Sequence, residues 1–452
     1  MRLESRKSKK TKKLRIENRE FRNSLTLFFL MLNAQFLVSC SDLSATRPQA
    51  NNIILSPVAF VTAAPLPEAS VTPTLAPLAT PSQPPPTAVP KKQPQDTTNA
   101  IGLWSERLIA TQPFTGFLDV AYGPGAVELQ KTTNPSLISL NARQFHIGFT
   151  DNYTSIRQSN PGWILTDSRG RIAFSTREGA PLVNIRDESV KDQIATNVVN
   201  WIAEQNYDGM ILNDIGVDLI RATNSPTYTG NKPFTDQQRR DTVEGLIRAI
   251  RTKSPDKILI VGGYVWRDGT AYAAHSSEAA DLGAIGDGVH IDEFLHSPIS
   301  TTAQFRDNAA WQRDIDYLNA ISKDGRIVLV TTRLVPTETD PNMIRQWLRY
   351  TVASYLLGKG GPHTYLQFDV GNLNYANEPE FRAPLGAPEA DYTKLDNGAY
   401  QRKFARGIVL VNPTDAAIEN IEFDGDYLTL SNTPTRKIAS MGAHTGIILL
   451  KP

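Results

Sequence analysis

Apolar strand-like runs separated by helical patterns recur along most of this chain, and this repetition constrains its fold more than any other feature. Eight such runs lie at residues 116–122, 144–151, 163–167, 208–214, 257–264, 288–293, 326–333 and 363–368. Alternating strands and helices predict a parallel sheet, and eight strands are the number that closes a (β/α)8 TIM barrel. A doubly wound open sheet is the alternative. Gly-Pro-Gly at 123–125 does not fit the Gly-rich phosphate loop that usually follows the first strand of such a sheet.

Helical patterns and a later change of pattern divide the globular part into two domains. Helices are predicted at 190–205, 235–253 and 342–357, between strands of the repeat. After residue 372 the apolar segments become short, alternating and β-branched, with Gly, Asn, Asp and Pro between them; they lie at 400–413, 418–423, 427–430 and 445–450. We predict a barrel over residues 99–375 and a small antiparallel β-domain over residues 376–452.

The N-terminus has the pattern of an export signal. Ten basic and three acidic residues in 1–24 precede an apolar stretch at 25–39, which is shorter than the ~20 residues that a spanning helix needs. The stretch ends in Leu37-Val38-Ser39-Cys40, which resembles a bacterial lipobox. We predict a lipoprotein signal peptide over residues 1–40, with lipidation at Cys40 and an anchor on the extracytoplasmic side of the membrane. An ordinary signal peptide and a short signal-anchor helix are the alternatives.

The residues that follow Cys40 are predicted to be a tether. Pro, Thr, Ala and Ser dominate residues 65–94, and no apolar periodicity is present, so the segment cannot bury enough surface to offset its ordering entropy. We predict disorder over 41–98. Most of the positive charge lies in the signal, which leaves no basic face for nucleic acid. Since Cys40 is the only cysteine, an internal disulfide and a Cys-based metal site are both excluded.

Two acids stand at the ends of predicted barrel strands, where barrel active sites form. Asn213-Asp214 ends the fourth strand, and Asp292-Glu293 ends the sixth. Asp214 and Glu293 each share a face with the alternate apolar residues before them, which we expect to point into the barrel. Two carboxylates across a cleft are what glycoside hydrolysis needs, one as acid and one as nucleophile or base. The alternative is that these acids cap helices or pair with an arginine.

Polar and aromatic residues at the same strand ends predict a carbohydrate-binding lining, because sugar rings stack on aromatic faces and their hydroxyls need fixed polar partners. Asp119 ranks first among the predicted hydroxyl-binding acids. The predicted substrate-binding residues are Asp119, Tyr122, Asp151, Asp167, Asn213, Tyr264, Trp266, Asp292, Arg333 and Gln367. No metal site is predicted, since the segment His290-Ile-Asp292-Glu-Phe-Leu-His296 lacks the H-E-x-x-H spacing. No cofactor is implied.

Two segments carry a resemblance to a known family. Residues 206–215 (NYDGMILNDI), preceded by VNIRD at 183–187, and residues 400–413 (YQRKFARGIVLVNP) resemble the fourth strand and the closing segment of secreted bacterial barrels assigned to the glycoside hydrolases. That family is distantly similar to the α-galactosidase clan, which also joins a barrel to a C-terminal β-domain.

The resemblance implies roles for two acids. The clan uses a nucleophilic Asp after the fourth strand and an acid/base carboxylate after the sixth, positions that match Asp214 and Glu293. The chain departs from the clan at Leu212, where the clan has Lys, and at Glu293, where it has Asp. We therefore expect a surface lipoprotein that hydrolyses an oligo- or polysaccharide. A barrel that binds glycan without cutting it, and a structural envelope lipoprotein, are the alternatives. The sequence does not indicate the sugar, the linkage or the oligomeric state.

Overall fold

A computed structural model describes residues 91–106, 117–144, 158–167, 169–174, 181–213, 227–228, 232–233, 236–262, 283–296, 300–334, 340–370 and 378–452. All of them belong to one compact unit, Gln83–Pro452. The predicted signal peptide, Cys40 and the tether up to residue 90 lie outside the described residues. Within the described part, none of the helices combines the length and hydropathy that a membrane span requires.

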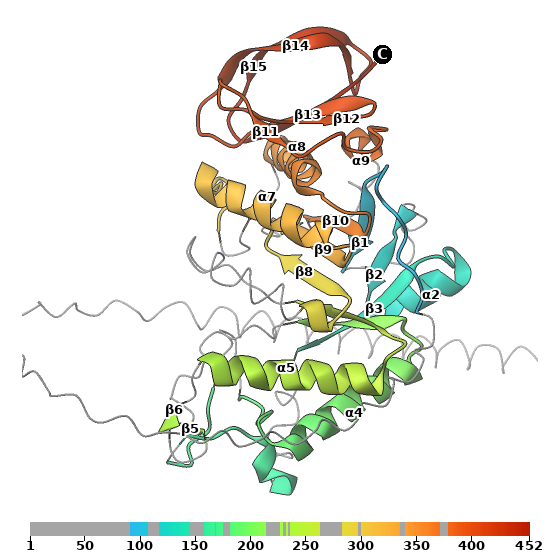
Figure 1. Ribbon diagram of the computed structural model, residues 1–452, viewed down its shortest axis with the longest axis vertical. Coiled ribbons are helices and arrows are strands. Elements are labelled where there is room, and N and C mark those ends of the chain that lie inside the picture. Colours follow the sequence, from blue (N-terminus) through green and yellow to red (C-terminus); the bar gives the residue numbers. More distant parts are fainter. Residues whose placement is uncertain are drawn as a thin grey trace, which may run out of the picture. The chain divides into compact units, whose positions relative to one another are not determined.

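Eight parallel strands close into a barrel, which confirms the predicted fold (Figure 1). Around the barrel they run in the order β1-β10-β9-β8-β7-β4-β3-β2. Their bounds are β1 Gly102–Ser105, β2 Val120–Tyr122, β3 Ile138–Gln144, β4 Gly209–Asn213, β7 Ile258–Val261, β8 Gly288–Asp292, β9 Ile327–Arg333 and β10 Thr364–Asp369. The helices of this part are α2 Pro124–Thr132, α4 Glu188–Glu204, α5 Asp236–Lys253, α7 Asn308–Lys323 and α8 Pro341–Gly358, together with the 3-10 turn η2 Pro161–Trp163 and the short pair β5 Thr227–Tyr228 and β6 Lys232–Pro233.

The last five predicted strands and the three predicted helices are confirmed, but the first three strands need correction. Strand β1 was not predicted, and the run predicted as the first strand contains β2, the second strand of the barrel. The second prediction, 144–151, starts where β3 ends. Residues 163–167 are not a barrel strand, because Ile164 and Thr166 form isolated antiparallel bridges to Val183 and Ile172. The predicted number of strands was therefore right although two of their positions were not.

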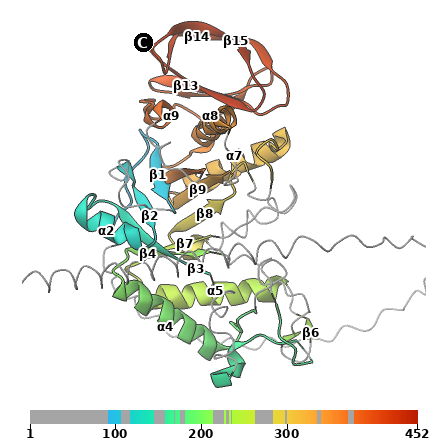
Figure 2. The ribbon, with the colours of Figure 1, turned by 180° about the vertical axis from the view of Figure 1, so that it is seen from behind.

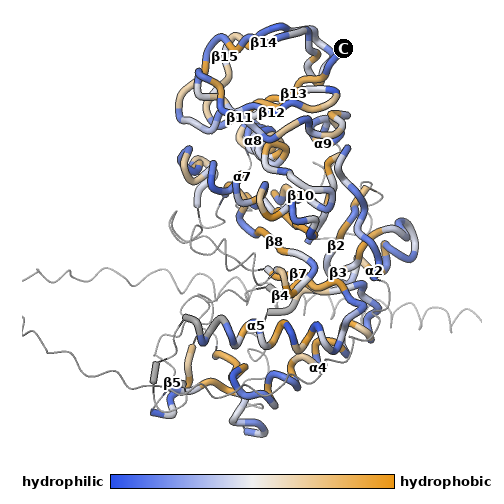
Figure 3. Tube along the Cα trace, viewed as in Figure 1, coloured by the Kyte–Doolittle hydropathy of each residue, from blue (hydrophilic) through white to orange (hydrophobic). Residues whose placement is uncertain are grey.

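Side chains along each barrel strand point alternately into the barrel and toward the helices, which gives separate interior and helix-facing hydrophobic clusters. Trp104, Ile211, Leu329 and Tyr365 belong to the cluster that fills the barrel. Their sequence neighbours pack outward against the helices, and these include Met210, Leu212, Val289, Ile291, Val328, Val330 and Leu366. Figure 3 shows the matching alternation of hydrophobic and hydrophilic residues along α4 and α5. The barrel is thus a packed core whose inner face carries every second residue of each strand.

Three aspartates brace the amino ends of the strands in one repeated geometry. Asp119, Asp208 and Asp287 precede β2, β4 and β8, and each accepts a hydrogen bond from a backbone N–H of the neighbouring strand at 2.8–2.9 Å. Each also donates its own N–H to the carbonyl of that same neighbour residue. Gly209 and Gly288 follow two of these acids, where a Cβ would lie 2.1 and 1.9 Å from the carbonyl oxygen of the adjacent strand. The Asp-Gly pairs are therefore structural.

The C-terminal residues form an antiparallel sheet, as predicted, and it has six strands in the order β11-β12-β13-β16-β14-β15. The strands are β11 Thr393–Lys394, β12 Tyr400–Phe404, β13 Gly407–Asn412, β14 Ile418–Thr429, β15 Pro434–Met441 and β16 Thr445–Leu450, preceded by the short helix α9 Pro379–Arg382. Two predicted strands, 418–423 and 427–430, are one strand with a register shift, and β15 was not predicted.

Helix α8 lies between the barrel and this sheet, as both ribbon views show (Figures 1 and 2). It is buried on nearly every side, from Trp347 to Gly358, because the barrel covers one face and the sheet another. Gly446 of β16 lies against the helix so closely that a Cβ there would come within 2.3 Å of Ala353 Cβ. The barrel and the sheet therefore share a hydrophobic core.

Residues 91–98, which the sequence assigns to the tether, lie on the barrel. Lys91 forms an ion pair with Asp287 at 2.6 Å, and Lys92 Nζ donates to the backbone of the segment before β3. Thr97 is buried, and its backbone N–H donates to Pro362 O. The predicted tether boundary at residue 98 is therefore too late.

Candidate active site

Charged residues of the barrel mouth lie at or directly after the carboxyl ends of β1, β8, β9 and β10. Following the interior alternation, His290 and Asp292 are the inward residues of β8, because Val289 and Ile291 pack against helices. The same holds in β4, where Met210 and Leu212 face helices. Asp214 and Glu293 were placed in the mouth on the assumption that the apolar residues before them point into the barrel. That assumption was wrong.

Arg333 is the centre of an ionic cluster formed by Glu106, Asp292, Arg333 and Asp369, which we call the mouth cluster. Its guanidinium pairs with Glu106 through Nη2, donates from Nε to Asp369 Oδ2 at 3.0 Å, and places Nη1 3.5 Å from Asp292 Oδ1. Burial by itself would lower the pKa of Arg333, but the three carboxylates raise it above the ordinary value. One cation among three acids leaves an excess of negative charge within this cluster.

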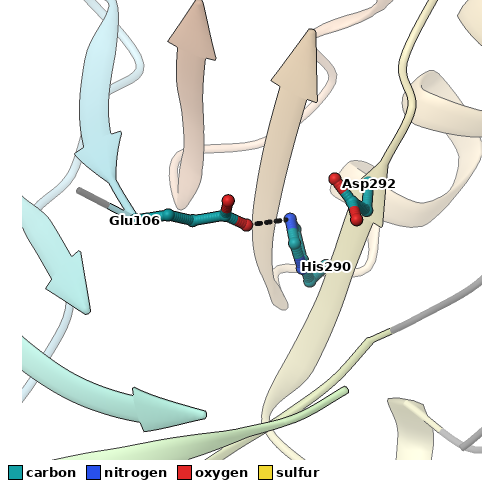
Figure 4. Close-up of side chains that lie close together, drawn as sticks. All are labelled: Glu106, His290 and Asp292. Atoms are coloured by element: carbon teal, nitrogen blue, oxygen red, sulfur yellow. Dashed lines mark ion pairs between the residues drawn. The ribbon is translucent and has the colours of Figure 1, made fainter. Parts of the chain in front are cut away.

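His290 lies beneath the mouth cluster and is almost fully buried. Its Nε2 is 3.1 Å from Thr331 Oγ1 and 3.3 Å from Glu106 Oε1, and its ring packs edge-on against Trp104 with the centroids 4.8 Å apart. Burial lowers the pKa of His290 to about 4, so the imidazole is neutral at pH 7. Figure 4 shows Glu106 and His290 pointing toward one another from opposite sides of the barrel interior, with Asp292 further along β8.

Glu293 follows β8 in a backbone conformation that residues with a side chain rarely adopt. Its φ is 99°, and the residue is 5% exposed. The N–H groups of Glu293 and Phe294 both donate to Thr331 O, at 3.3 and 2.8 Å, and Arg306 donates to the Glu293 carbonyl. The positive φ ends the strand alternation at Asp292, so the direction of the Glu293 side chain does not follow from the residues before it.

The structure brings four of the predicted lining residues close to Glu106, and one of them is Asp292, whose carboxylate lies within 4.8 Å of that of Glu106. Tyr122 ends β2, and its pKa is raised by burial and by the charge of Glu106. Gln367 accepts a hydrogen bond from Glu106 N at 3.2 Å, and its buried Nε2 has no hydrogen-bond partner among the described residues. Arg333 pairs with Glu106 directly. The predictions for these residues thus converge on one end of the barrel.

Two predicted lining acids lie elsewhere. Asp119 does not end a strand, since it precedes β2 and braces the amino end of the barrel beside Leu103. Burial raises the pKa of Asp119 to about 6 there. Asp167 accepts from the N–H groups of Arg169 and Arg171 and from Arg171 Nε, so it closes a turn outside the barrel strands.

The remaining predicted residues cannot be compared with the geometry. Asp151, Asp214, Tyr264 and Trp266, together with the side chain of Asn213, lie outside the described residues. The separation of the Asp214 and Glu293 carboxyl groups lies outside them as well.

The sequence reasoning missed Glu106 and Asp369. Glu106 follows Ser105, at the end of a four-residue strand that the apolar pattern did not reveal. Asp369 could have been found, because it shares a face of β10 with Gln367 two residues earlier. His296, which the sequence places near His290, is separate from the cluster; its ring packs on Trp347, and its Nδ1 contacts Arg333 O at 2.7 Å.

Solved structures of similar fold include several carbohydrate-active barrels. An α-amylase from Anoxybacillus is 12% identical, with 75% of this chain and 88% of that chain covered and a TM-score of 0.47. The glycoside hydrolase domain of PelA from Pseudomonas aeruginosa is 12% identical over 60% of this chain and 95% of that one, with a TM-score of 0.39. The maltogenic α-amylase AmyB from Thermotoga neapolitana is 12% identical over 78% and 98%, with a TM-score of 0.45. Similarity this low transfers no residue role.

The family assignment rests on the sequence itself. A search of curated proteins finds no match. The sequence profile of the hypothetical glycosyl hydrolase family 15 matches residues 139–408, which is more than half of the chain. This match confirms the predicted resemblance to a glycoside hydrolase family, while the likeness to the α-galactosidase clan stays a prediction. The chain therefore belongs to the hypothetical glycosyl hydrolase family 15.

Proposed function

We propose that this protein is a lipid-anchored glycoside hydrolase that cleaves an extracellular oligo- or polysaccharide at the carboxyl-end mouth of its barrel. The observation that carries the proposal is the position of Glu293. It is a buried acidic residue held in a left-handed backbone conformation at the end of a barrel strand, directly after Asp292 of the mouth cluster. Glu293 is the proposed acid/base, and Asp214 is the proposed nucleophile.

The backbone at Glu293 supports a functional role. A residue with a side chain in this region of φ costs about 1–3 kcal/mol, and such residues persist where surrounding contacts enforce them, most often at active sites. Here Thr331 O receives two backbone N–H groups, and Arg306 bonds the carbonyl while also pairing with the buried Asp314. These contacts fix the backbone that carries the acid before substrate arrives, and a general acid requires such a fixed support.

The charge of the mouth cluster also suits the reaction. Glycoside hydrolysis passes through an oxocarbenium-like transition state, in which positive charge develops on the sugar ring. Three carboxylates around the single guanidinium of Arg333 create a negative potential at this end of the barrel. Such a fixed potential stabilises the transition state more than the neutral substrate.

The side chain of Gln367 offers a hydrogen-bond donor that a hydroxylated ligand could use. Its Oε1 accepts from Glu106 N, while Nε2 is buried and donates to no described residue. A buried donor left without an acceptor costs about 1–3 kcal/mol. The hydroxyl oxygens of a sugar would supply the missing acceptor, and Tyr122 at the end of β2 offers an aromatic face nearby.

The location completes the proposal. A diacylglyceryl group on Cys40 would hold the protein on the extracytoplasmic side of a bacterial membrane, and the Pro-rich residues that follow would give the barrel reach toward a polymer. The expected partners are a carbohydrate substrate and the membrane.

The test is hydrolysis by the purified full chain across a panel of polysaccharides, read as the release of reducing ends. Asp214→Asn and Glu293→Gln should each lower the rate by at least about 100-fold, the scale on which general acid–base groups act. Asp119→Asn is the matched control, since it makes the same chemical change at the opposite end of the barrel and should keep wild-type activity. Wild-type rates in both site variants on a cleaved substrate would refute the residue assignment.

A binding module is the second candidate function, and one observation favours it. Arg333 engages Glu106 and approaches Asp292, as expected where acids serve fixed contacts with a ligand. Glycan that binds with a measurable Kd while no reducing ends appear, with binding lost in Arg333→Gln, would select this function over hydrolysis.

A further inference from the structure

We propose that Glu106, His290 and Asp292 bind a divalent cation with mixed oxygen and nitrogen preference, of the Zn²⁺ or Mn²⁺ class. The inference stands apart from hydrolysis, because it concerns what the three side chains coordinate and not what the barrel cleaves. One nitrogen and two carboxylate oxygens, one atom from each residue, lie within 4.8 Å of one another. Figure 4 shows the three side chains converging in the barrel interior.

The spacing fits a cation after a small movement. A point equidistant from three atoms 4.8 Å apart lies about 2.8 Å from each, and the bonds of zinc to histidine and carboxylate are about 2.0–2.2 Å. Shifts of under about 1 Å in the two carboxylate side chains, within their rotamer freedom, would close that gap. The imidazole, which Trp104 holds edge-on, is the fixed member of the set.

The donor set has the chemistry of a metal centre. Carboxylate oxygens with an imidazole nitrogen suit zinc and manganese, whereas calcium and magnesium prefer oxygen alone. Coordination needs the lone pair of His290 Nε2, so the proton must lie on Nδ1. Thr331 Oγ1, which is 3.1 Å from Nε2, would give up that contact to the cation.

Arg333 orients both carboxylate ligands, through Glu106 Oε2 and through Asp292 Oδ1, and the cation would share the second of these atoms with the guanidinium. Glu106 directs Oε2 to the guanidinium and Oε1 to within 3.3 Å of His290 Nε2. Asp292 Oδ1 is buried and accepts no hydrogen bond within the described part of the chain, with Arg333 Nη1 3.5 Å away. Ligating carboxylates that are themselves held by a neighbour bind metal more tightly. Asp369 on Arg333 Nε offsets part of the guanidinium charge.

The experiment measures metal bound by the full chain. After treatment with a chelator and dialysis, the protein is titrated with ZnCl₂ and, separately, with MnCl₂, by calorimetry and by elemental analysis of the gel-filtered complex. The expected result is one ion per chain for at least one of the two metals. Glu106→Gln and His290→Gln should each weaken binding at least 10-fold, since loss of a residue that only orients a ligand already costs that much. His296→Gln is the matched control, because it removes a nearby histidine that is outside the set.

The outcomes separate cleanly. No binding of either metal at millimolar concentration by the wild-type chain would overturn the inference, and so would binding that survives both ligand variants. If His290→Gln fails to fold, judged by circular dichroism, Glu106→Gln and Asp292→Asn decide the question. Because the readout is bound metal, a negative result leaves the proposed hydrolysis untouched, and inactivity on every glycan leaves the metal site untouched.

Discussion

Arg333 Nε donates to Asp369 Oδ2 at 3.0 Å, which joins the last residues of two neighbouring barrel strands. The same guanidinium reaches Glu106 across β10, so a single side chain ties three strands at the mouth. Electrostatic cohesion of the mouth therefore depends on this arginine.

We predict that Arg333→Gln destabilises the protein by about 3–5 kcal/mol at pH 7, the scale for removing one partner of a buried ion pair. Thermal unfolding of wild type and variant at pH 7 measures the loss. Arg436→Gln is the control, because its pair with Asp426 is exposed and should change stability by less than about 1 kcal/mol. Equal effects of the two substitutions would contradict the role assigned to Arg333.

Glycine should suit position 293 better than alanine. The φ of 99° is ordinary for glycine and strained for any residue with a Cβ. We predict that Glu293→Gly is more stable than Glu293→Ala by about 1 kcal/mol, although both lose the carboxyl and hence any hydrolysis. Urea denaturation of the two variants measures the difference. A more stable alanine variant would mean that the left-handed conformation relaxes when the carboxyl is removed.

Asp119 should make the free energy of unfolding depend on pH in the acidic range. Burial raises its pKa from 3.8 to about 6, against the opposing influence of the Leu103 N–H and of Lys359. A raised pKa in the folded state gives stability that is complete below pH 3.8 and is lost as pH rises through 6, by at most about 3 kcal/mol. We predict that Asp119→Asn removes this decline between pH 4 and 6.

Lys359 does not obscure that measurement. Burial lowers the pKa of Lys359 to about 7, so its own contribution is lost as pH falls from 10.5 through 7 and is constant below 6. Chemical denaturation at half-unit steps of pH, wild type against variant, gives the comparison. Parallel curves for the two proteins between pH 4 and 6 would show that Asp119 is not the titrating group.

The anchor prediction concerns Cys40, which lies outside the described residues. Cells that are fed a labelled fatty acid should incorporate label into the wild-type protein and none into Cys40→Ser, which should stay uncleaved or become soluble. Ser39→Thr keeps the cysteine and is the comparison variant. Absence of label from the wild-type chain would end the lipoprotein proposal and leave export open.

The segment 91–98 should contribute to stability. A chain that starts at residue 91 keeps the Lys91–Asp287 ion pair and the buried Thr97, whereas one that starts at residue 99 loses both. We predict that the shorter chain melts several degrees lower, and that limited proteolysis of the full chain gives a stable fragment that begins before residue 91. A protease-resistant fragment that begins near residue 100, with an unchanged melting temperature, would argue for the tether boundary at residue 98.

Sequence patterns predicted the strand–helix repeat well, and they failed over its first three strands. Strands β7, β9 and β10 are buried on both faces, as parallel barrel strands are, so their apolar runs stand out. Strand β1 has four residues and β2 has three, too few for a period to show. Residues 163–167 have strand-like composition, but they pair locally with the antiparallel segment around Val183. A one-dimensional pattern does not distinguish that pairing from a barrel strand.

The site was harder to predict than the fold for a geometric reason. Strand β8 alternates apolar Val289 and Ile291 with polar residues, and the sequence analysis assumed that the apolar residues face the barrel interior, whereas they pack against the helices. His290 and Asp292 belong to the interior instead. Glu106 approaches them only because the barrel closes, and no spacing in the sequence encodes a contact between β1 and β8. Arg333 and Gln367 were predicted because they lie at or near the carboxyl ends of long strands with clear apolar runs.

Arg402 of the C-terminal sheet donates through Nη1 to the carbonyl oxygens of Leu356, Leu357 and Lys359, where α8 ends. The terminus of a barrel helix is thus capped by a side chain from the β-domain. Neither the barrel nor the sheet is a transferable module. A chain cut after β10 would leave α8 without its cap and would expose the apolar face of α8 that the sheet covers. A chimera of this chain that swaps the sheet therefore has to bring an arginine to this position.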